Sequence, residues 1–360
     1  MIYFDCDYAE GAHPKILERL METNDEQTQT YGEDGHCAKA AELIKHCCVS
    51  PSAAVHFFTG GTQANLTVIG ALLRPYQGVI ASVWGHIGEH ETGAIEATGH
   101  KVLTVANDDG KITAAQIDEL CRAHKDDPSH EHIVQPGMVY ISHPTEYGTL
   151  YTKPELEAIR RVCDIWELPL YMDGARMGYG IAAAAQNLAA GERLMLPDIA
   201  VLCDVFYVGG TKVGAMFGEA VVITCDEFKK DFRYYIKQRG GLLAKGRMLG
   251  IQFEVLFEGG HYDETLYNKI SDHAILMAGL IRKACVDKGY GFLCETYANQ
   301  VFPILPEHVI AELREKYVFL TWAAAGEING ERHYAVRLCT SWATKEENVA
   351  ALTEDIATIT

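Results

Sequence analysis

The sequence is poor in positive charge and in long apolar segments, and each shortage excludes a class of protein. Its 360 residues carry 31 lysines and arginines against 49 aspartates and glutamates, a formal net charge of −18. Such a chain repels phosphate backbones, which argues against nucleic acid as a partner. No apolar run is long enough to span a bilayer. The N-terminus has no basic region followed by an apolar core, so we expect neither a signal peptide nor a membrane partner.

Paired cysteines are also missing. Eleven cysteines are present, but no Cys-x-x-Cys pair occurs. Several, such as Cys203 and Cys339, lie in apolar stretches, which is typical of reduced thiols in the core of a cytosolic protein. Hydrophobic residues make up 48% of the chain and charged residues 22%, so we expect a folded, cytoplasmic protein with a substantial core.

Apolar runs alternate with helical spacing between residue 53 and about residue 224. We expect strands over residues 54–58, 79–84, 101–105, 138–142, 168–172, 201–207 and 220–224, and helices over 62–73, 88–99, 114–124 and 154–166. Nearly continuous apolar strands separated by helices indicate an α/β fold whose mostly parallel sheet is covered on both faces. Ligands then bind at the C-terminal ends of the strands.

The last third of the chain has a different pattern. Helices are expected over residues 226–238 and 242–257, followed by a boundary at Gly259-Gly260. A helix over 273–287, two or three strands and a helix over 345–356 predict a small α+β domain. We therefore assign residues 1–258 to an N-terminal arm plus the large domain, and residues 259–360 to the small domain.

Lys212 is an unusual lysine, because it lies among small residues just after an apolar strand-like run. Apolar surroundings depress a lysine's pKa and leave some amine free to attack an aldehyde. Asp173 ends another predicted strand about forty residues upstream. Pyridoxal phosphate (PLP) requires such a pair, because the lysine bonds to its aldehyde and the carboxylate holds its ring N–H. Taken alone, Lys212 favours the simpler interpretation of a cap on a glycine turn, and the structural alternative for Asp173 is a helix N-cap.

The segment Thr59-Gly60-Gly61-Thr62 follows a strand and opens a helix. Free backbone N–H groups and the positive helix end make such a junction an anion site, and glycine lets the backbone approach closely. With Lys212 and Asp173 downstream, we interpret Gly61 and Thr62 as a phosphate cradle. A tight strand-to-helix turn is the structural alternative.

Two arginines are candidates for binding a substrate carboxylate. Arg176 follows Asp173 by three residues, and Arg337 lies inside an apolar strand of the small domain. A carboxylate would satisfy either guanidinium bidentately. That carboxylate could equally belong to the protein, with Asp173 or Asp204 as the alternative partner of Arg176.

His86 admits two interpretations. His86-Ile87-Gly88-Glu89-His90 matches the H-x-x-E-H pattern of a zinc hydrolase, with both histidines on one helical face. Alternatively, His86 follows a strand directly and stacks on the cofactor ring. Gly88 weakens the helix that zinc would need, so we expect no metal. A buried histidine without a functional role is the third possibility.

Together these residues resemble the low-specificity L-threonine aldolases of the beta-eliminating lyase family, over essentially the whole chain. The resemblance implies the aspartate-aminotransferase-like PLP fold (fold type I). Seven matching motifs occur in order: Asp5-Cys6-Asp7-Tyr8, Tyr31-Gly32-Glu33-Asp34, Gly61-Thr62-Gln63-Ala64-Asn65, His86, Asp173-Gly174-Ala175-Arg176, Lys212 and Arg337-Leu338-Cys339-Thr340-Ser341-Trp342.

The resemblance implies a role for each matched residue. Lys212, His86, Glu146 and Asp173 are the catalytic residues. The cofactor would be held by Gly61, Thr62, His86, Asp173, Arg176, Thr211, Lys212 and Lys245, and the substrate by Cys6, Tyr31, Arg176 and Arg337. Tyr31 and Lys245 would approach a neighbour's cofactor, since the family forms homodimers or homotetramers with active sites at the subunit interface.

Two positions depart from the family pattern. Cys6 replaces a frequent serine, and Glu146 stands where the family often has a histidine that contacts the substrate's β-hydroxyl, with His143 close by. The implied reaction is retro-aldol cleavage of L-threonine or L-allo-threonine through a Lys212 Schiff base. The base is Glu146, His86 or His143. Three alternatives stay open: β-elimination or racemisation on the same scaffold, a zinc hydrolase built on His86 and His90, and a PLP-fold protein that binds without turnover.

Overall fold

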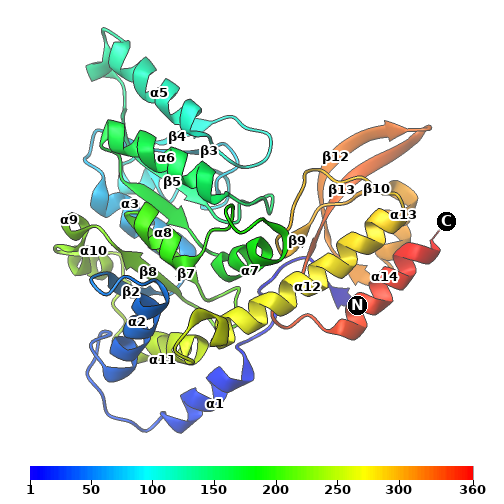
Figure 1. Ribbon diagram of the computed structural model, residues 1–360, viewed down its shortest axis with the longest axis horizontal. Coiled ribbons are helices and arrows are strands. Elements are labelled where there is room, and N and C mark those ends of the chain that lie inside the picture. Colours follow the sequence, from blue (N-terminus) through cyan, green and yellow to red (C-terminus); the bar gives the residue numbers. More distant parts are fainter. Residues whose placement is uncertain (360) are drawn as a thin grey trace.

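The computed structural model describes residues 1–359, and a seven-stranded sheet lies at the centre of its large domain (Figure 1). The strand order is β2-β8-β7-β6-β5-β3-β4. The strands are β2 (Ala54–Phe58), β3 (Gln77–Ser82), β4 (Val102–Val105), β5 (Gln135–Ser142), β6 (Leu170–Asp173), β7 (Val205–Gly209) and β8 (Glu219–Ile223). Neighbours from β4 to β7 are parallel, whereas β8 runs antiparallel to β7 and β2. The predicted mostly parallel sheet is confirmed.

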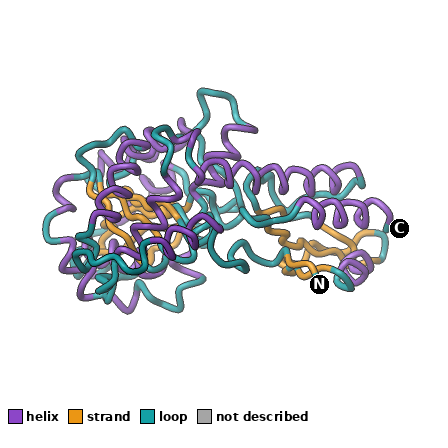
Figure 2. The backbone as a smooth tube through the Cα atoms, turned by 90° about the horizontal axis from the view of Figure 1, so that it is seen from below, coloured by secondary structure: helices purple, strands orange, loops and turns teal. Residues whose placement is uncertain are grey.

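Helices cover both faces of this sheet (Figures 1 and 2). Those before the small domain are α1 (Pro14–Glu22), α2 (Gly35–Cys47), α3 (Gly61–Leu72), α4 (His86–Glu89), α5 (Ala114–Asp126), α6 (Lys153–Trp166), α7 (Met177–Asn187), α8 (Leu196–Leu202), α9 (Asp226–Lys229), α10 (Phe232–Gln238) and α11 (Arg247–Phe257). Short 3-10 turns occur at Glu96–Thr98, His130–His132 and Tyr262–Glu264. Helices α3 and α10 pack on one face, and α2, α6, α7, α8 and α11 on the other.

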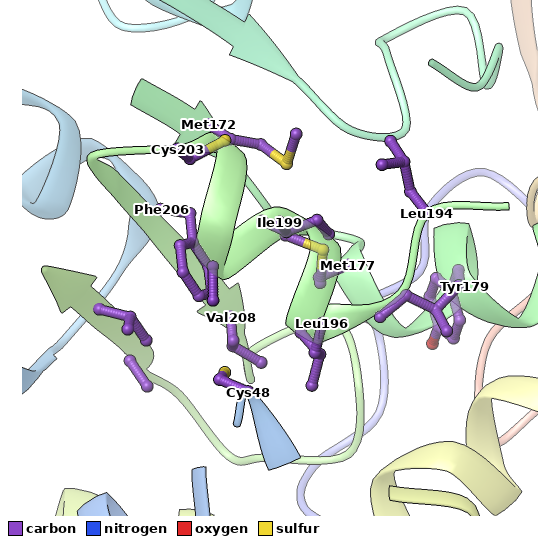
Figure 3. Packing of buried hydrophobic residues seen from close by; sticks show 14 of the residues in the cluster. Cys48, Met172, Met177, Tyr179, Leu194, Leu196, Ile199, Cys203, Phe206 and Val208 are labelled. Carbon is purple, nitrogen blue, oxygen red and sulfur yellow. The ribbon is translucent and has the colours of Figure 1, made fainter. Parts of the chain in front are cut away.

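Strict alternation along the buried strands divides the core into two layers. In β7, Phe206 and Val208 enter the layer shared with α7 and α8, where they lie near Met172 and Ile199 (Figure 3). Tyr207 points to the opposite face with the α3 layer. All five residues of β7 are buried, as expected for a central strand with helices on both sides.

The small domain is built on an antiparallel sheet and on one long helix. Its elements are β1 (Ile2–Tyr3), β9 (Gln300–Val301), β10 (Ile304–Pro306), β11 (Tyr317–Val318), β12 (Leu320–Ile328), β13 (Glu331–Cys339), α12 (Leu266–Asp287), α13 (Glu307–Leu313) and α14 (Glu346–Thr358). The N-terminal strand β1 pairs with β11, so the first residues belong to the core of this domain. Within residues 1–359, no helix combines the length and apolar character needed to cross a membrane.

Helix α12 joins the two domains. Its first half, including Tyr267 and Ala274, packs in the large domain's core, and its second half, including Met277 and Ile281, packs in the small domain's core. Figure 1 shows it running from one domain into the other. The predicted boundary at residue 259 stays a prediction, since the helix that follows it is shared.

Several predicted elements have different bounds in the structure. The helix expected over residues 88–99 is wrong: α4 ends at Glu89, and Thr92 and Gly93 adopt positive φ, which interrupts a helix. The strand expected from residue 201 begins only at Val205, because residues 196–202 form α8 with a proline in its first turn. The helix expected over residues 226–238 is divided by Asp231, which also has positive φ.

Candidate active site

The polar turns at one edge of the sheet meet in a single cleft. Five turns that follow parallel strands contribute, through Gly61, His86, Glu146, Asp173 and Lys212. The small domain closes the cleft with Trp322 of β12 and Arg337 of β13. The parallel order of the strands brings these residues together from distant points in the sequence. Sequence reasoning placed the five large-domain residues at strand ends, and the structure shows that they share one cleft.

Asp173 ends β6 as a buried carboxylate with four hydrogen-bond donors. Tyr140 and Asn65 donate to Oδ2 at 2.7 and 3.1 Å, and the Tyr207 hydroxyl and the Ala175 N–H donate to Oδ1. Burial alone would raise the pKa of this carboxyl, but the charge of His86 and the two tyrosine hydroxyls outweigh burial and lower the pKa. Asp173 is therefore ionised at neutral pH.

Lys212 follows β7 and its amine lies 5.9 Å from the centroid of the Tyr8 ring. Burial and the positive charge of Arg176 lower the pKa of this amine, against the opposing charges of Asp7 and Asp173. The backbone is fixed by the Tyr179 hydroxyl, which donates to the Lys212 carbonyl. A depressed pKa leaves more neutral amine for attack on a carbonyl group.

The turn between β2 and α3 presents backbone donors to the cleft. No side chain caps the N-terminus of α3, whose N-cap residue is Gly60, so its first N–H groups have no partner within the helix. A Cβ on Gly61 would lie 2.9 Å from the Tyr207 hydroxyl, so the close approach of chain and tyrosine requires glycine. The residues fit the phosphate-bearing cofactor that the sequence predicts.

His86 lies in a hydrogen-bonded chain that leads back to Asp173. Its Nδ1 is 2.8 Å from Oε1 of Glu91, and Asn65 donates to the same oxygen at 2.7 Å. Asn65 is also a donor to Asp173. Burial disfavours the charged imidazole, but the hydrogen bond to Glu91 and the charge of Asp173 outweigh burial and raise the pKa of His86. The imidazole is thus protonated at higher pH than an ordinary histidine.

Glu146 and His143 differ sharply in access to the cleft. Glu146 lines it, and its Oε1 accepts hydrogen bonds from the backbone N–H of His86 at 2.9 Å and from the Ser142 hydroxyl at 2.7 Å. Burial raises the pKa of Glu146. His143 is fully buried outside the cleft, where burial lowers its pKa to about 4 and neither ring nitrogen has a partner. Of the three predicted bases, Glu146 and His86 face the site.

The two arginines have different partners. Arg176 donates through Nε and Nη2 to the buried carboxylate of Asp7, at 2.6 and 3.0 Å. From the sequence, the alternative partner of Arg176 within the protein was Asp173 or Asp204. In the structure the partner is Asp7, and Asp204 pairs with Arg160 instead. Two of the five N–H groups of the Arg176 guanidinium, and its charge, are therefore paired inside the protein.

Arg337 has a donor left over. Its Nη2 donates to the Asp5 carbonyl at 2.9 Å, and its guanidinium carbon lies 5.2 Å from the centroid of the Trp322 ring. Its Nε is buried without a hydrogen-bond partner, and among residues 1–359 no carboxylate forms an ion pair with it. An unpaired arginine at a cleft wall is costly unless a ligand satisfies it.

Three predicted residues do not line this cleft. Cys6 lies next to the cleft residues of the N-terminal arm, and burial raises the pKa of its thiol. Tyr31 and Lys245 lie on the surface beside each other, because the Tyr31 N–H donates to the carbonyl of Ala244 at 3.2 Å. Their proximity agrees with a shared role, but contact with a neighbouring subunit's site remains a prediction.

The comparison with known proteins decides the family. Residues 7–354 match the beta-eliminating lyases.

The chain belongs to the beta-eliminating lyase family.

Its relatives are named as threonine aldolases. The chain is 31% identical to low-specificity L-threonine aldolases of a Pseudomonas species and of Pseudomonas aeruginosa, covering 99% and 98% of this chain and 97% and 96% of theirs. The structure is similar to that of a threonine aldolase of Leishmania major, with 43% identity, a TM-score of 0.91, and coverage of 99% of this chain and 98% of that one. The aspartate aminotransferase of Thermus thermophilus, at 15% identity, TM-score 0.68 and coverage of 99% and 91%, shares the fold. The predicted family and fold type I are confirmed.

Membership of the beta-eliminating lyase family makes the chain a PLP-dependent lyase. The cleft has the parts that such a lyase needs: a lysine whose pKa is lowered, a buried carboxylate that is ionised, and N–H groups at a helix N-terminus without partners in the helix. The zinc alternative is not favoured. Nδ1 of His86 is occupied by Glu91, and the described residues contain no group of three or more histidines, cysteines or carboxylates that could hold a metal.

Sequence reasoning missed the residues that hold the predicted ones in place. Glu91, Asp7, Tyr140, Tyr207 and Glu219 are all buried at or beside the cleft. Their signal in the sequence is faint. A carboxylate or tyrosine inside an apolar run needs a partner when buried, and Glu219 and Tyr207 both occur in such runs.

Replacing Glu91 should change the protonation of His86. Glu91→Gln removes the negative hydrogen-bond partner that helps raise the pKa of the imidazole, so that pKa should fall by about one unit or more. An NMR titration of the His86 ring nitrogens measures it. Glu89→Gln, an exposed carboxylate two residues away, is the control and should leave the titration unchanged. An unchanged His86 titration in Glu91→Gln would contradict the assigned role.

Proposed function

We propose that this protein cleaves L-threonine or L-allo-threonine to glycine and acetaldehyde by a PLP-dependent retro-aldol reaction. The observation that carries the proposal is the cleft itself. Asp173 ends β6, Lys212 lies in the turn after the neighbouring strand β7, and Arg337 faces them from the small domain with an unpaired Nε. The threonine aldolase names of the relatives that span the whole chain support the same reaction.

The cofactor would be held from four sides. Lys212 would bond to its aldehyde, Asp173 would bind its ring nitrogen, and His86 would lie against its ring. Gly61 and Thr62 would bind its phosphate through the N-terminal N–H groups of α3. When bound, PLP supplies the electron sink for the pair released at Cα. An ionised Asp173 keeps the ring nitrogen protonated, which that role requires.

The substrate carboxylate would bind to Arg337. Among residues 1–359 no carboxylate pairs with Arg337, whereas the charge of Arg176 is paired with Asp7. Arg176 then acts chiefly by its charge and by fixing the N-terminal arm, with Cys6 near the substrate. Holding the carboxylate against the small domain fixes which bond at Cα is aligned for cleavage, here the Cα–Cβ bond.

Glu146 is the proposed base. It takes the proton of the β-hydroxyl as the Cα–Cβ bond breaks, the aldehyde leaves, and Cα then receives a proton to give glycine. Burial raises the pKa of Glu146, which makes its carboxylate a stronger base than an exposed one. His86 is less suited, because the hydrogen bond to Glu91 favours its protonated form.

Assembly and location are part of the proposal. Tyr31 and Lys245 lie together on the surface outside their own chain's cleft, so they are free to complete the site of a neighbour in a homodimer or homotetramer. The cysteines of the described residues form no disulfide, in keeping with a reducing, cytoplasmic environment.

The purified protein with PLP should absorb visible light and release acetaldehyde and glycine from at least one of the two threonine diastereomers. Lys212→Ala should lose the visible band and lower kcat by several orders of magnitude, since the covalent attachment is lost. Absorbance spectra and a coupled acetaldehyde assay measure both. Turnover to a keto acid and ammonia, without acetaldehyde, would overturn the aldolase proposal in favour of β-elimination.

Glu146→Gln should separate two reactions. Aldol cleavage should slow by about 100-fold or more, the usual contribution of a general base. Exchange of the α-proton of glycine involves no β-hydroxyl and should be nearly unchanged. In the wild type, cleavage should fall as pH drops through the raised pKa of Glu146, because only the carboxylate form accepts a proton. Acetaldehyde release and NMR-detected glycine exchange give the two rates; equal losses would make Glu146 a structural residue.

Arg337→Ala should raise KM for the amino acid much more than it weakens PLP binding. Loss of a buried bidentate contact costs about 2–4 kcal/mol, or roughly 30- to 1000-fold in KM. Arg332→Ala is the matched control on the same strand, because that arginine is exposed and pairs with Glu307. If KM were unchanged in Arg337→Ala while thermal stability fell, the arginine would have only a structural role.

A further inference from the structure

Glu219 is a buried carboxylate at the site that the reaction above does not use. It is 4% exposed and begins β8. The strand register places it opposite Phe58 of β2 on one side and Gly209 of β7 on the other. Phe58 leads into the glycine turn before α3, and Gly209 leads into Lys212. Glu219 therefore lies between the turn that would bind phosphate and the turn that carries the lysine.

Its hydrogen bonds control the hydroxyl of Thr211. Thr211 Oγ1 accepts from the Gly218 N–H at 2.9 Å and lies 2.8 Å from Glu219 Oε1. The other carboxylate oxygen accepts from the Gly210 N–H at 3.1 Å. A hydroxyl has one proton. While Glu219 is ionised, Thr211 donates that proton to it and has none left for a ligand.

Protonation of Glu219 reverses this hydrogen bond without moving a heavy atom. Oε1 then donates to Thr211 Oγ1, which can accept two hydrogen bonds. The Thr211 proton is then free for a ligand in the cleft, which both residues line. The Gly210 N–H still has its acceptor, because Oε2 keeps a lone pair.

We propose that protonated Glu219 turns the Thr211 hydroxyl toward the cofactor phosphate, so that phosphate binding requires a proton on this carboxyl. The inference rests on the proposed function, since it concerns the phosphate of the cofactor proposed there. It assigns Glu219 as a positioning residue, which acts through Thr211 and does not touch the reacting atoms.

The surroundings of Glu219 favour the protonated form at neutral pH. Burial raises its pKa to about 8, in spite of the Thr211 hydroxyl and the charge of Lys212. The titratable groups that face it are Tyr207 from β7, Lys212 from the turn after β7, Asp173 and Tyr171 from β6, and Tyr267 from α12. On the β2 side its neighbour is Phe58, which has no charge. A bound phosphate dianion would raise the pKa further by repulsion.

The direction of the pH effect follows. The affinity for the phosphate is highest at pH values where Glu219 is protonated. It falls as the pH rises through the pKa of Glu219. For a pKa of about 8, the protonated fraction falls about tenfold between pH 7 and pH 9, so the dissociation constant should rise about tenfold. Phosphate esters have a second pKa near 6, so the ligand stays a dianion across this window.

The test is calorimetric titration of the PLP-free protein with pyridoxine 5′-phosphate at pH 7, 8 and 9. This ligand has an alcohol in place of the aldehyde and forms no bond with Lys212, which removes that chemistry from the pH profile. Glu219→Gln should keep only the shallower pH dependence of pyridoxine, the same ring without its phosphate, because its amide donates to Thr211 permanently. Thr211→Ser keeps the hydroxyl, so its dissociation constant should rise with pH with the same slope as that of the wild type. Thr211→Val should bind more weakly at pH 7 with a shallower slope.

Each contrary result has a distinct meaning. A wild-type constant that does not change with pH, or a Glu219→Gln slope equal to that of the wild type, would overturn the role of Glu219. A slope in Thr211→Val as steep as the wild type's would overturn the role of the hydroxyl. Pyridoxine without its phosphate reports the slope that comes from titration of the ring nitrogen held by Asp173. It should be shallower than that of the phosphate ester, and an equal slope would also overturn the inference. Failure of pyridoxine 5′-phosphate to bind at any pH would overturn the proposed function as well.

Discussion

The burial of one ionised carboxylate, Asp173, is the constraint on which the site depends. A buried charge is costly unless several donors replace its water. The donors are Tyr140 of β5, Tyr207 of β7, Asn65 of α3 and the backbone N–H of Ala175 in the turn after β6. The order β7-β6-β5 at the centre of the sheet is therefore also the arrangement that keeps Asp173 charged. A different strand order would leave that charge without its tyrosines.

The same cleft holds carboxylates in opposite states. Donors and the charge of His86 lower the pKa of Asp173, whereas burial raises the pKa of Glu146 and of Glu219. An acid–base site needs such a separation, because groups with equal pKa values would gain and lose protons together. Asp173 and Glu219 are both 4% exposed, so the difference between their pKa values comes from how many donors and positive charges each carboxylate meets. The chain's net charge of −18 makes local compensation more important.

Sequence reasoning found what strand periodicity and strand ends can show. Residues at the ends of parallel strands share an edge whatever the strand order, so Gly61, His86, Asp173 and Lys212 could be grouped before any coordinates were known. Pairs far apart in sequence could not be found this way. Arg176 meets Asp7 across 169 positions, and nothing in the sequence separated Asp7 from Asp173 or Asp204 as its partner. The helix expected over residues 88–99 failed for a local reason, since positive φ at Thr92 and Gly93 depends on the turn that delivers Glu91 to His86.

The N-terminal segment shows how the two domains are held to one site. Strand β1 pairs with β11 in the small domain, and the Asp5 carbonyl accepts from Arg337. Two residues later, Asp7 binds Arg176 of the large domain and Asn299, which precedes β9 of the small domain. The segment thus contacts both arginines that the sequence predicted as carboxylate binders, Arg337 through Asp5 and Arg176 through Asp7. Asp7 neutralises the charge of Arg176 and takes two of its five N–H groups, whereas Arg337 meets only a backbone carbonyl. Among residues 1–359, Arg337 is therefore the arginine of this pair whose charge has no carboxylate partner.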